Sequence, residues 1–155
     1  NKNARKQLSA LWFGRQSYQA AVNLLSQGIQ LDPHDSELRL LQARIYIKQG
    51  RQSLAFDSLN TLPNVAQIES IDYQALLATQ AQKVQQYQSA ISAYLQLITQ
   101  QAEVGRWWMG LAIAYDSNSQ FALAGQAYHK ALMLGGLSTS ASKFIRQRIQ
   151  VLGES

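Results

Sequence analysis

The sequence predicts an all-α fold in which pairs of helices repeat along the chain. Hydrophobic residues make up 46% of the 155 residues, Pro occurs only 2 times, and helix-forming Leu, Ala and Gln are abundant. An Ala followed four positions later by a large apolar residue recurs at an almost constant interval. Turn-forming residues fall between the periodic segments, where a chain of helix pairs needs them.

The recurring pattern defines four repeats, expected over residues 2–35, 36–70, 71–104 and 105–138, whose starts lie 34, 35 and 34 residues apart. Their small residues are Ala21, Ala55, Ala90 and Ala124. The large residues that follow are Leu25, Leu59, Tyr94 and Tyr128. We expect the alanines where the two helices of a pair cross, and the large residues in the gap to the next helix. One domain over residues 1–155 follows from this stacking.

Punctuation residues divide the expected helices. The Asp32-Pro33-His34-Asp35-Ser36 segment ends the first repeat, and Asp35 or Ser36 can cap the helix that follows. Gly50, residues 117–119 and the Gly135-Gly136 pair mark other turns. After the fourth repeat, residues 140–152 predict a capping helix with an apolar stripe that covers the open end of the stack. The stripe consists of Phe144, Ile145, Ile149 and Leu152, with Lys143, Arg146 and Arg148 lying off it.

The last repeat carries the most complete motif. Its ordered positions are Trp108, Leu111-Ala112, Tyr115, Ala124, Tyr128 and Ala131. This order resembles the tetratricopeptide repeat (TPR), W-x2-L-G-x2-Y followed by A-x3-F and A. The resemblance implies a right-handed α-solenoid of about four TPR helix-turn-helix repeats plus a C-terminal capping helix. It also implies a non-enzymatic scaffold whose groove binds a peptide or protein partner.

The sequence offers no recognisable catalytic, cofactor or metal site. Cys is absent, and the 2 histidines, His34 and His129, lie far apart in the chain. Acidic residues form no pair at catalytic spacing, and Gly135-Gly136 lacks the residues of a phosphate-binding loop. We therefore expect no enzymatic activity and no cofactor. The net charge of +5 leaves a basic binder of nucleic acid or another anionic polymer as a weaker alternative, since the repeat core uses most aromatic residues.

We expect the groove along the first helix of each repeat. Its residues should lie at the positions of these helices that do not belong to the packing pattern. The predicted partner-binding residues are Lys6, Phe13, Glu37, Leu40, Arg44, Lys48, Asp72, Thr79, Lys83, Arg106, Met109 and Ile113. Ala10, Ala75 and Asp116 belong to the same register. This mixture suits an extended or helical peptide with apolar and acidic features. Trp107 is the aromatic residue that the motif does not require, so it either packs against the preceding repeat or anchors a partner.

Some TPR proteins hold the C-terminal carboxylate of chaperones with a clamp of Lys, Asn and Arg on successive first helices. The matching positions here are Asn3 and Gln7, Glu37 and Leu41, and Asp72 and Leu76. The clamp residues are absent, which argues against a receptor for chaperone tails.

A narrower resemblance covers the last third of the chain. The segments GRWWMGLA at 105–112, ALMLGGL at 131–137 and FIRQRIQVL at 144–152 resemble the C-terminal region of biogenesis proteins of the MSHA type IV pilus. The resemblance implies a TPR domain in the bacterial periplasm that docks pilus-assembly components, with an inner-membrane segment upstream of Asn1. A cytoplasmic location and a domain that serves mainly self-association stay open as alternatives. Because the chain begins with Asn1 rather than Met, we expect a piece of a longer protein.

Overall fold

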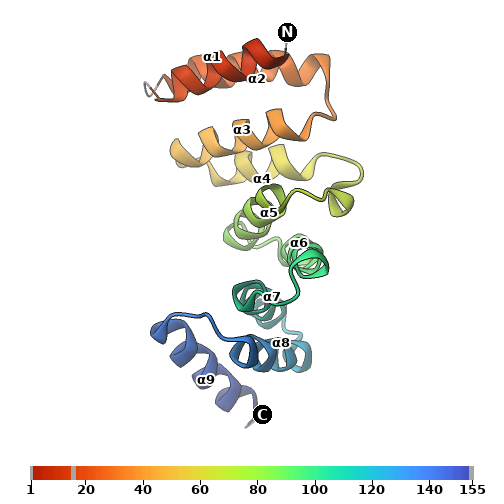
Figure 1. Ribbon diagram of the computed structural model, residues 1–155, viewed down its shortest axis with the longest axis vertical. Helices are drawn as coiled ribbons and strands as arrows, with labels where there is room; N and C mark the ends of the chain where they lie inside the picture. The colour runs from red at the N-terminus through yellow and green to blue at the C-terminus, as the bar shows by residue number, and fades with distance from the viewer. Residues whose placement is uncertain (1, 15–16, 154–155) are drawn as a thin grey trace. The chain divides into compact units, whose positions relative to one another are not determined.

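The computed structural model describes the backbone of residues 2–14 and 17–153, and the side chains of residues 2–10 and 17–153. All regular elements in these ranges are helical, which confirms the all-α prediction (Figure 1). The chain divides into two compact units, Asn1–Ile68 and Glu69–Ser155. The prediction of one domain over 1–155 therefore stays a prediction. Trp12 and Phe13 belong to the first helix, and their side chains lie outside the described residues.

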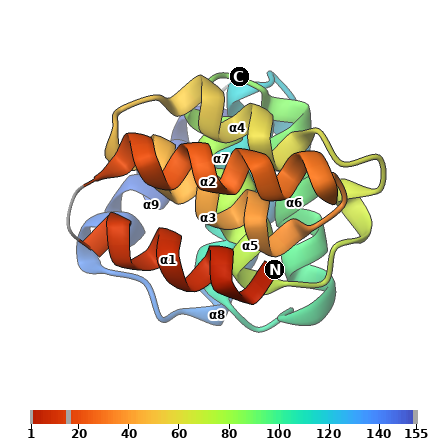
Figure 2. The same ribbon diagram turned by 90° about the horizontal axis from the view of Figure 1, so that it is seen from above.

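The first unit consists of two helix pairs and a short 3-10 helix. Its elements are α1 (Lys2–Gly14), α2 (Tyr18–Leu31), α3 (Ser36–Lys48), α4 (Gln52–Asn60) and η1 (Val65–Gln67). Helix α1 packs on α2, α2 on α3, and α3 on α4. Figure 2 shows α1 and α2 side by side, with the N-terminus at the start of α1. The unit is therefore a stack of antiparallel helix pairs in chain order.

The second unit contains two further helix pairs and a final helix. Its elements are α5 (Ile71–Lys83), α6 (Tyr87–Gln100), α7 (Gly105–Ser117), α8 (Phe121–Leu134) and α9 (Thr139–Gly153). Each helix packs on the next, and α9 packs on α8 (Figure 1). Helices α3, α5 and α7 begin at the residues where the second, third and fourth sequence repeats begin. We call α1, α3, α5 and α7 first helices, and α2, α4, α6 and α8 second helices.

The first helices start with side-chain caps in two of the repeats. Asp35 accepts the N–H of Leu38 at 3.1 Å, as the sequence predicts, and Ser70 accepts the N–H of Tyr73 at 3.2 Å. These bonds satisfy backbone donors that have no partner inside the helix. Asp35 also forms an ion pair with Lys2 at 2.6 Å, which raises the pKa of Lys2. The capping residue therefore also links α1 to the start of α3.

The small residues of the repeat pattern lie in the core, as predicted. Ala21, Ala55, Ala90 and Ala124 each have an exposed fraction of 0%. The large residues one turn later, Leu25, Leu59, Tyr94 and Tyr128, are buried as well. A methyl group at each crossing lets the two helix backbones approach closely, and the larger side chains fill the adjacent space.

The core of the first unit also contains a buried polar network that the pattern did not predict. Gln42 stands where the motif has Leu, and its Oε1 accepts the Ser58 hydroxyl at 2.7 Å. Arg39, which is buried too, donates to the carbonyl oxygens of Pro33 at 2.8 Å and Ser58 at 3.2 Å. Burying a polar or charged side chain costs little free energy only when the side chain is hydrogen-bonded, as these are. The network links α3 to α4 through Ser58.

A left-handed residue ends the first helix of three repeats. Gly50, Gln85 and Ser119 have φ angles of 74°, 62° and 61°. The N–H of the next residue then reaches the carbonyl oxygen five positions back, at 2.8 Å in all three turns. Only Gly adopts this conformation without steric cost, so Gln85 and Ser119 hold it under strain.

We therefore expect Gln85→Gly and Ser119→Gly to stabilise the protein, each by up to about 1 kcal/mol, because glycine removes the clash of Cβ with the backbone. Urea unfolding followed by circular dichroism measures the change. Ser92→Gly, at an exposed position inside α6, is the matched control and should lower stability by about 0.5–1 kcal/mol. Equal losses in all three variants would contradict the assignment.

Two helical glycines differ in what surrounds them. A Cβ atom at Gly110 would overlap the ring of Tyr94, whereas a Cβ at Gly125 would meet nothing within 4 Å. We expect Gly110→Ala to lower the free energy of unfolding by about 1–3 kcal/mol, because the buried ring must move. Gly125→Ala should raise it by about 0.5–1 kcal/mol through helix propensity alone. Thermal and urea unfolding of both variants provide the test, and equal stabilities would show that the ring does not limit this contact.

Candidate protein-binding surfaces

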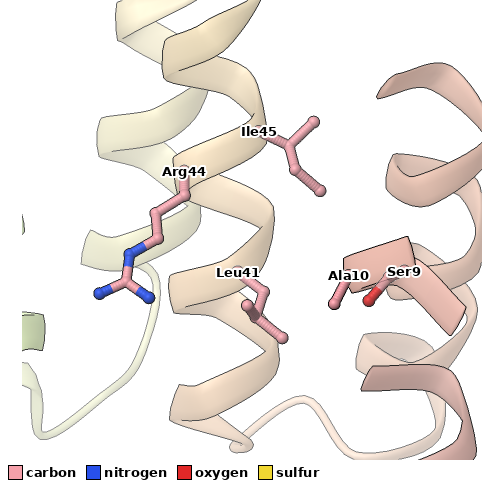
Figure 3. Close-up of a pocket in the computed structure, with 5 residues that line it drawn as sticks. All are labelled: Ser9, Ala10, Leu41, Arg44 and Ile45. Carbon is pink, nitrogen blue, oxygen red and sulfur yellow. The ribbon is translucent and has the colours of Figure 1, made fainter. Parts of the chain in front are cut away.

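A pocket lies between the first helices of the first unit. It has a volume of about 240 Å³ and is lined by Ser9, Ala10, Leu41, Arg44 and Ile45. Figure 3 shows Leu41 and Ile45 pointing toward α1, while the guanidinium group of Arg44 points away from Ser9 and Ala10. The Ser9 hydroxyl donates to the carbonyl oxygen of Lys6 at 3.0 Å. The pocket surface is therefore mainly apolar, with a cation at one side.

Among the predicted groove residues of the first unit with described side chains, Arg44 lines this pocket. Lys6 of α1 forms an ion pair with Glu37 of α3. Leu40 is half-buried, and Arg44 and Lys48 are exposed along α3. The pattern missed Ser9, Leu41 and Ile45 as lining residues. Leu41 and Ile45 are each one position after a predicted groove residue, Leu40 and Arg44. Their spacing of four, which places two apolar side chains on one helix face, was the sequence signal that could have identified them.

The second unit carries the remaining predicted groove residues on α5 and α7. Asp72, Thr79 and Lys83 are exposed on α5, and the Thr79 hydroxyl donates to the backbone of its own helix. On α7, Arg106 is exposed and Met109 and Ile113 are half-buried. Every predicted groove residue with a described side chain is thus at least partly accessible. Whether these residues bind a partner stays a prediction.

The structure distinguishes the two adjacent tryptophans. Trp107 is only 8% exposed, and its indole N–H donates to Gln101 Oε1 at 2.8 Å. Arg106 lies 4.5 Å above the centre of its ring. Burial favours the packing role for Trp107 over the anchoring role. Trp108, which the motif assigns to packing, is half-exposed, and its N–H donates to the carbonyl oxygen of Ala102 at 2.8 Å.

Asp116, placed on the groove face by register, instead binds the final helix. Its Oδ2 accepts Arg148 Nε at 2.8 Å, and its Oδ1 accepts Arg148 Nη2 at 2.8 Å. The Tyr128 hydroxyl also donates to Oδ2, at 2.9 Å. Arg148, expected on the open side of its helix, is thus half-buried in a bidentate pair. Burial raises the pKa of Tyr128, and the hydrogen bond to Asp116 raises it further.

The apolar stripe of α9 is only partly used in packing. Ile145 is fully buried, and Ile149 and Leu152 are half-buried. Phe144 is exposed over part of its surface, although its ring packs edge-on against that of Tyr128, with 6.2 Å between the centroids. The helix thus covers the last repeat through a narrow apolar contact and the Arg148–Asp116 pair.

The part of the chain that the structure describes contains no group of three or more His, Asp or Glu side chains placed to hold a metal ion. Within the same residues, no helix is both long enough and apolar enough to cross a membrane.

Stacked helix pairs with small residues at each crossing define a repeat scaffold of the protein-interaction class. Tetratricopeptide-repeat family models match residues 13–79 and 76–140, and together they span most of the chain. The chain belongs to the tetratricopeptide-repeat family.

Solved structures and a curated relative agree with this fold. The crystal structure of a MamA protein is similar to this chain with a TM-score of 0.76, 18% identity, and coverage of 98% of this chain and 80% of that one. MamA from Desulfovibrio magneticus RS-1 gives 0.75 with 15% identity, covering 98% and 89%. The BBSome complex member BBS4 homolog of Drosophila melanogaster is 25% identical over 140 residues, which are 86% of this chain but only 28% of that protein.

The Arg148–Asp116 pair generates a prediction for the final helix. Asp116→Ala leaves Arg148 and Tyr128 without their acceptor, so we expect it to lower the free energy of unfolding of the second unit by about 1–3 kcal/mol. Arg148→Ala added to Asp116→Ala should cost little more, because the two changes remove the same interaction. Urea unfolding of the single and double variants measures this coupling. Arg146→Ala, at an exposed position of α9, serves as the control, and additive losses would argue against the pair.

Proposed function

We propose that the first helices of this TPR scaffold bind a peptide or protein partner without catalysing a reaction. The proposal rests on the pocket between α1 and α3. This pocket has a mainly apolar surface, and the exposed Arg44 of α3 lies at its edge. Pockets of this kind accept an apolar side chain of a partner, and the adjacent cation selects a neighbouring acidic group.

Charge on the first helices supports a partner with acidic features. In the first unit, Arg44 and Lys48 are exposed on α3, and Glu37 of the same helix forms an ion pair with Lys6. In the second unit, Lys83 and Arg106 are exposed, and Asp72 with the half-buried Met109 and Ile113 makes the first-helix surface mixed rather than uniformly basic. A partner with alternating apolar and acidic residues therefore matches it better than a uniformly charged polymer.

The proposed setting is assembly of an MSHA-type pilus. The segments at 105–112, 131–137 and 144–152 resemble the C-terminal region of the pilus biogenesis protein MshN. We infer from this resemblance that the domain faces the bacterial periplasm, attached to the inner membrane, and docks pilus-assembly components. The matched relative from Drosophila is a member of a protein complex, which supports a scaffold role. It does not bear on the proposed role in pilus assembly.

Self-association through the final helix is the second candidate function. Phe144 and Val151 of α9 are exposed large hydrophobic side chains, at 41% and 51%. Such residues favour contact with another protein surface when they lie together. Light scattering at several concentrations separates the candidates, because a strictly monomeric chain rules out self-association.

For the leading proposal, we expect Arg44→Glu combined with Lys83→Glu to reduce partner capture several-fold without unfolding the domain. Both side chains are exposed on first helices, so charge reversal repels an acidic partner while the core stays intact. The measurement is quantitative pull-down from the native cell envelope, with pilus-assembly proteins as the expected hits. Lys143→Glu on α9 is the matched control. Undiminished capture by the double variant would refute the assignment.

A further inference from the structure

A second hollow lies in the second unit, among helices α6, α7 and α8. Its volume is about 310 Å³, near the lower end of the roughly 300–1,000 Å³ of small-ligand pockets, so it suits an anchoring side chain. Leu111 and Ala127 are buried at its base. Leu95 and Leu123 are 44% and 41% exposed, from α6 and α8. The lining is completed by Trp108, Tyr115, Gln126 and Lys130.

Trp108, Leu111 and Tyr115 of this lining are motif residues, but the repeat motif does not specify Leu95 and Leu123. The equivalent positions lie 34 residues earlier for α7 and α8, and 35 residues earlier for α6. In place of Leu95, Trp108, Leu123 and Lys130 they hold Asn60, Gln74, Ser89 and Gln96. Polar side chains therefore satisfy the same helix geometry one repeat before. Leu95 and Leu123 thus expose apolar surface that the preceding repeat does without, and such surface indicates an interaction site.

The hollow and the proposed groove lie on opposite sides of α7. Trp108, Leu111 and Tyr115 line the hollow. The groove residues Arg106, Met109 and Ile113 each precede one of them by two positions. An offset of two residues turns roughly 200° around a helix axis. A partner held on the first helices therefore leaves the hollow accessible.

Charge around the hollow selects its occupant. Helices α6 and α8 contain no acidic residue, and Asp116 of α7 is engaged by Arg148. Lys130 is the charged residue of the lining, and its ammonium group lies 5.8 Å from the centre of the Trp108 ring. A carboxylate beside an apolar anchor would pair with this cation while the anchor contacts Trp108, Leu95 and Leu123.

We propose that this hollow binds an acidic amphipathic helix of a partner protein. The helix inserts a large apolar side chain between Leu95 and Leu123 and places a carboxylate beside Lys130. Helices with apolar residues at i and i+4 dock into grooves of this kind. The site would give the scaffold a second partner, bound independently of the first-helix groove.

The test uses the full chain and a fluorescently labelled helical peptide with two leucines at i and i+4 and glutamates on its other faces. Anisotropy titration gives the affinity. Leu95→Asn with Leu123→Ser installs the residues of the preceding repeat and should weaken binding at least tenfold with an unchanged circular dichroism spectrum. Lys130→Gln should weaken it several-fold. Lys143→Glu, a charge reversal at an exposed position of α9 outside the lining, should leave the affinity unchanged.

Two further measurements complete the experiment. A peptide with lysines in place of the glutamates should bind at least tenfold more weakly than the acidic peptide. Absence of binding by the unmodified chain, equal affinity for the lysine peptide, or undiminished binding by the leucine variant would each overturn the proposal. Sedimentation velocity tests a second copy as the occupant. A dimer that Leu95→Asn with Leu123→Ser dissolves would assign the hollow to self-contact and overturn the proposal as well.

Discussion

The close crossing of two helices at a buried alanine is the constraint on which the structure depends. Ala21, Ala55, Ala90 and Ala124 have no exposed surface, and any larger side chain there would force the paired helices apart. One pair cannot cover its own apolar faces, so it needs a neighbouring pair. Each helix buries one face in these contacts, and its other face is exposed or half-buried. Much of each helix therefore remains at the surface, where binding residues can vary without disturbing the fold.

The same constraint explains which features the sequence predicts. Small residues at a fixed interval indicate where helix backbones cross, so the helices and the repeat starts can be predicted from the sequence. The Asp35 cap can be predicted because it lies at one of these repeat starts. Helical register predicts the face of the helix on which a residue lies. It does not predict which side chains of other helices contact that residue. Asp116 was misplaced because its partner Arg148 lies 32 residues away. The exposures of Trp107 and Trp108 depend likewise on the helices around α7, and the Gln42–Ser58 network replaces a Leu that the motif expects.

Repetition offers an internal comparison that a single copy of a fold does not. Positions that the fold requires, such as the alanines and the residues four places later, keep their character in every repeat. Other positions change from polar to apolar between repeats, as from Asn60 to Leu95 and from Ser89 to Leu123. Such changes point to binding rather than to folding. Helix α7 combines both, because one face completes the hollow and the opposite face belongs to the proposed groove. One helix thus carries both proposed surfaces, one on each face.

The attachment of α9 has a consequence for how the molecule opens. Interior helices pack between two neighbours, whereas α9 packs on α8 through Ile145 and is held to α7 by one ion pair. Segments with few buried apolar contacts exchange their amide hydrogens through local opening, well below the free energy of global unfolding. Within the second unit, α9 is thus the helix that we expect to open most readily. Each opening removes Phe144 from the Tyr128 ring and breaks the Arg148–Asp116 pair, whereas the Tyr128–Asp116 hydrogen bond joins α8 to α7 and remains. Thermal fluctuation at this end thus transiently enlarges the apolar surface of α8.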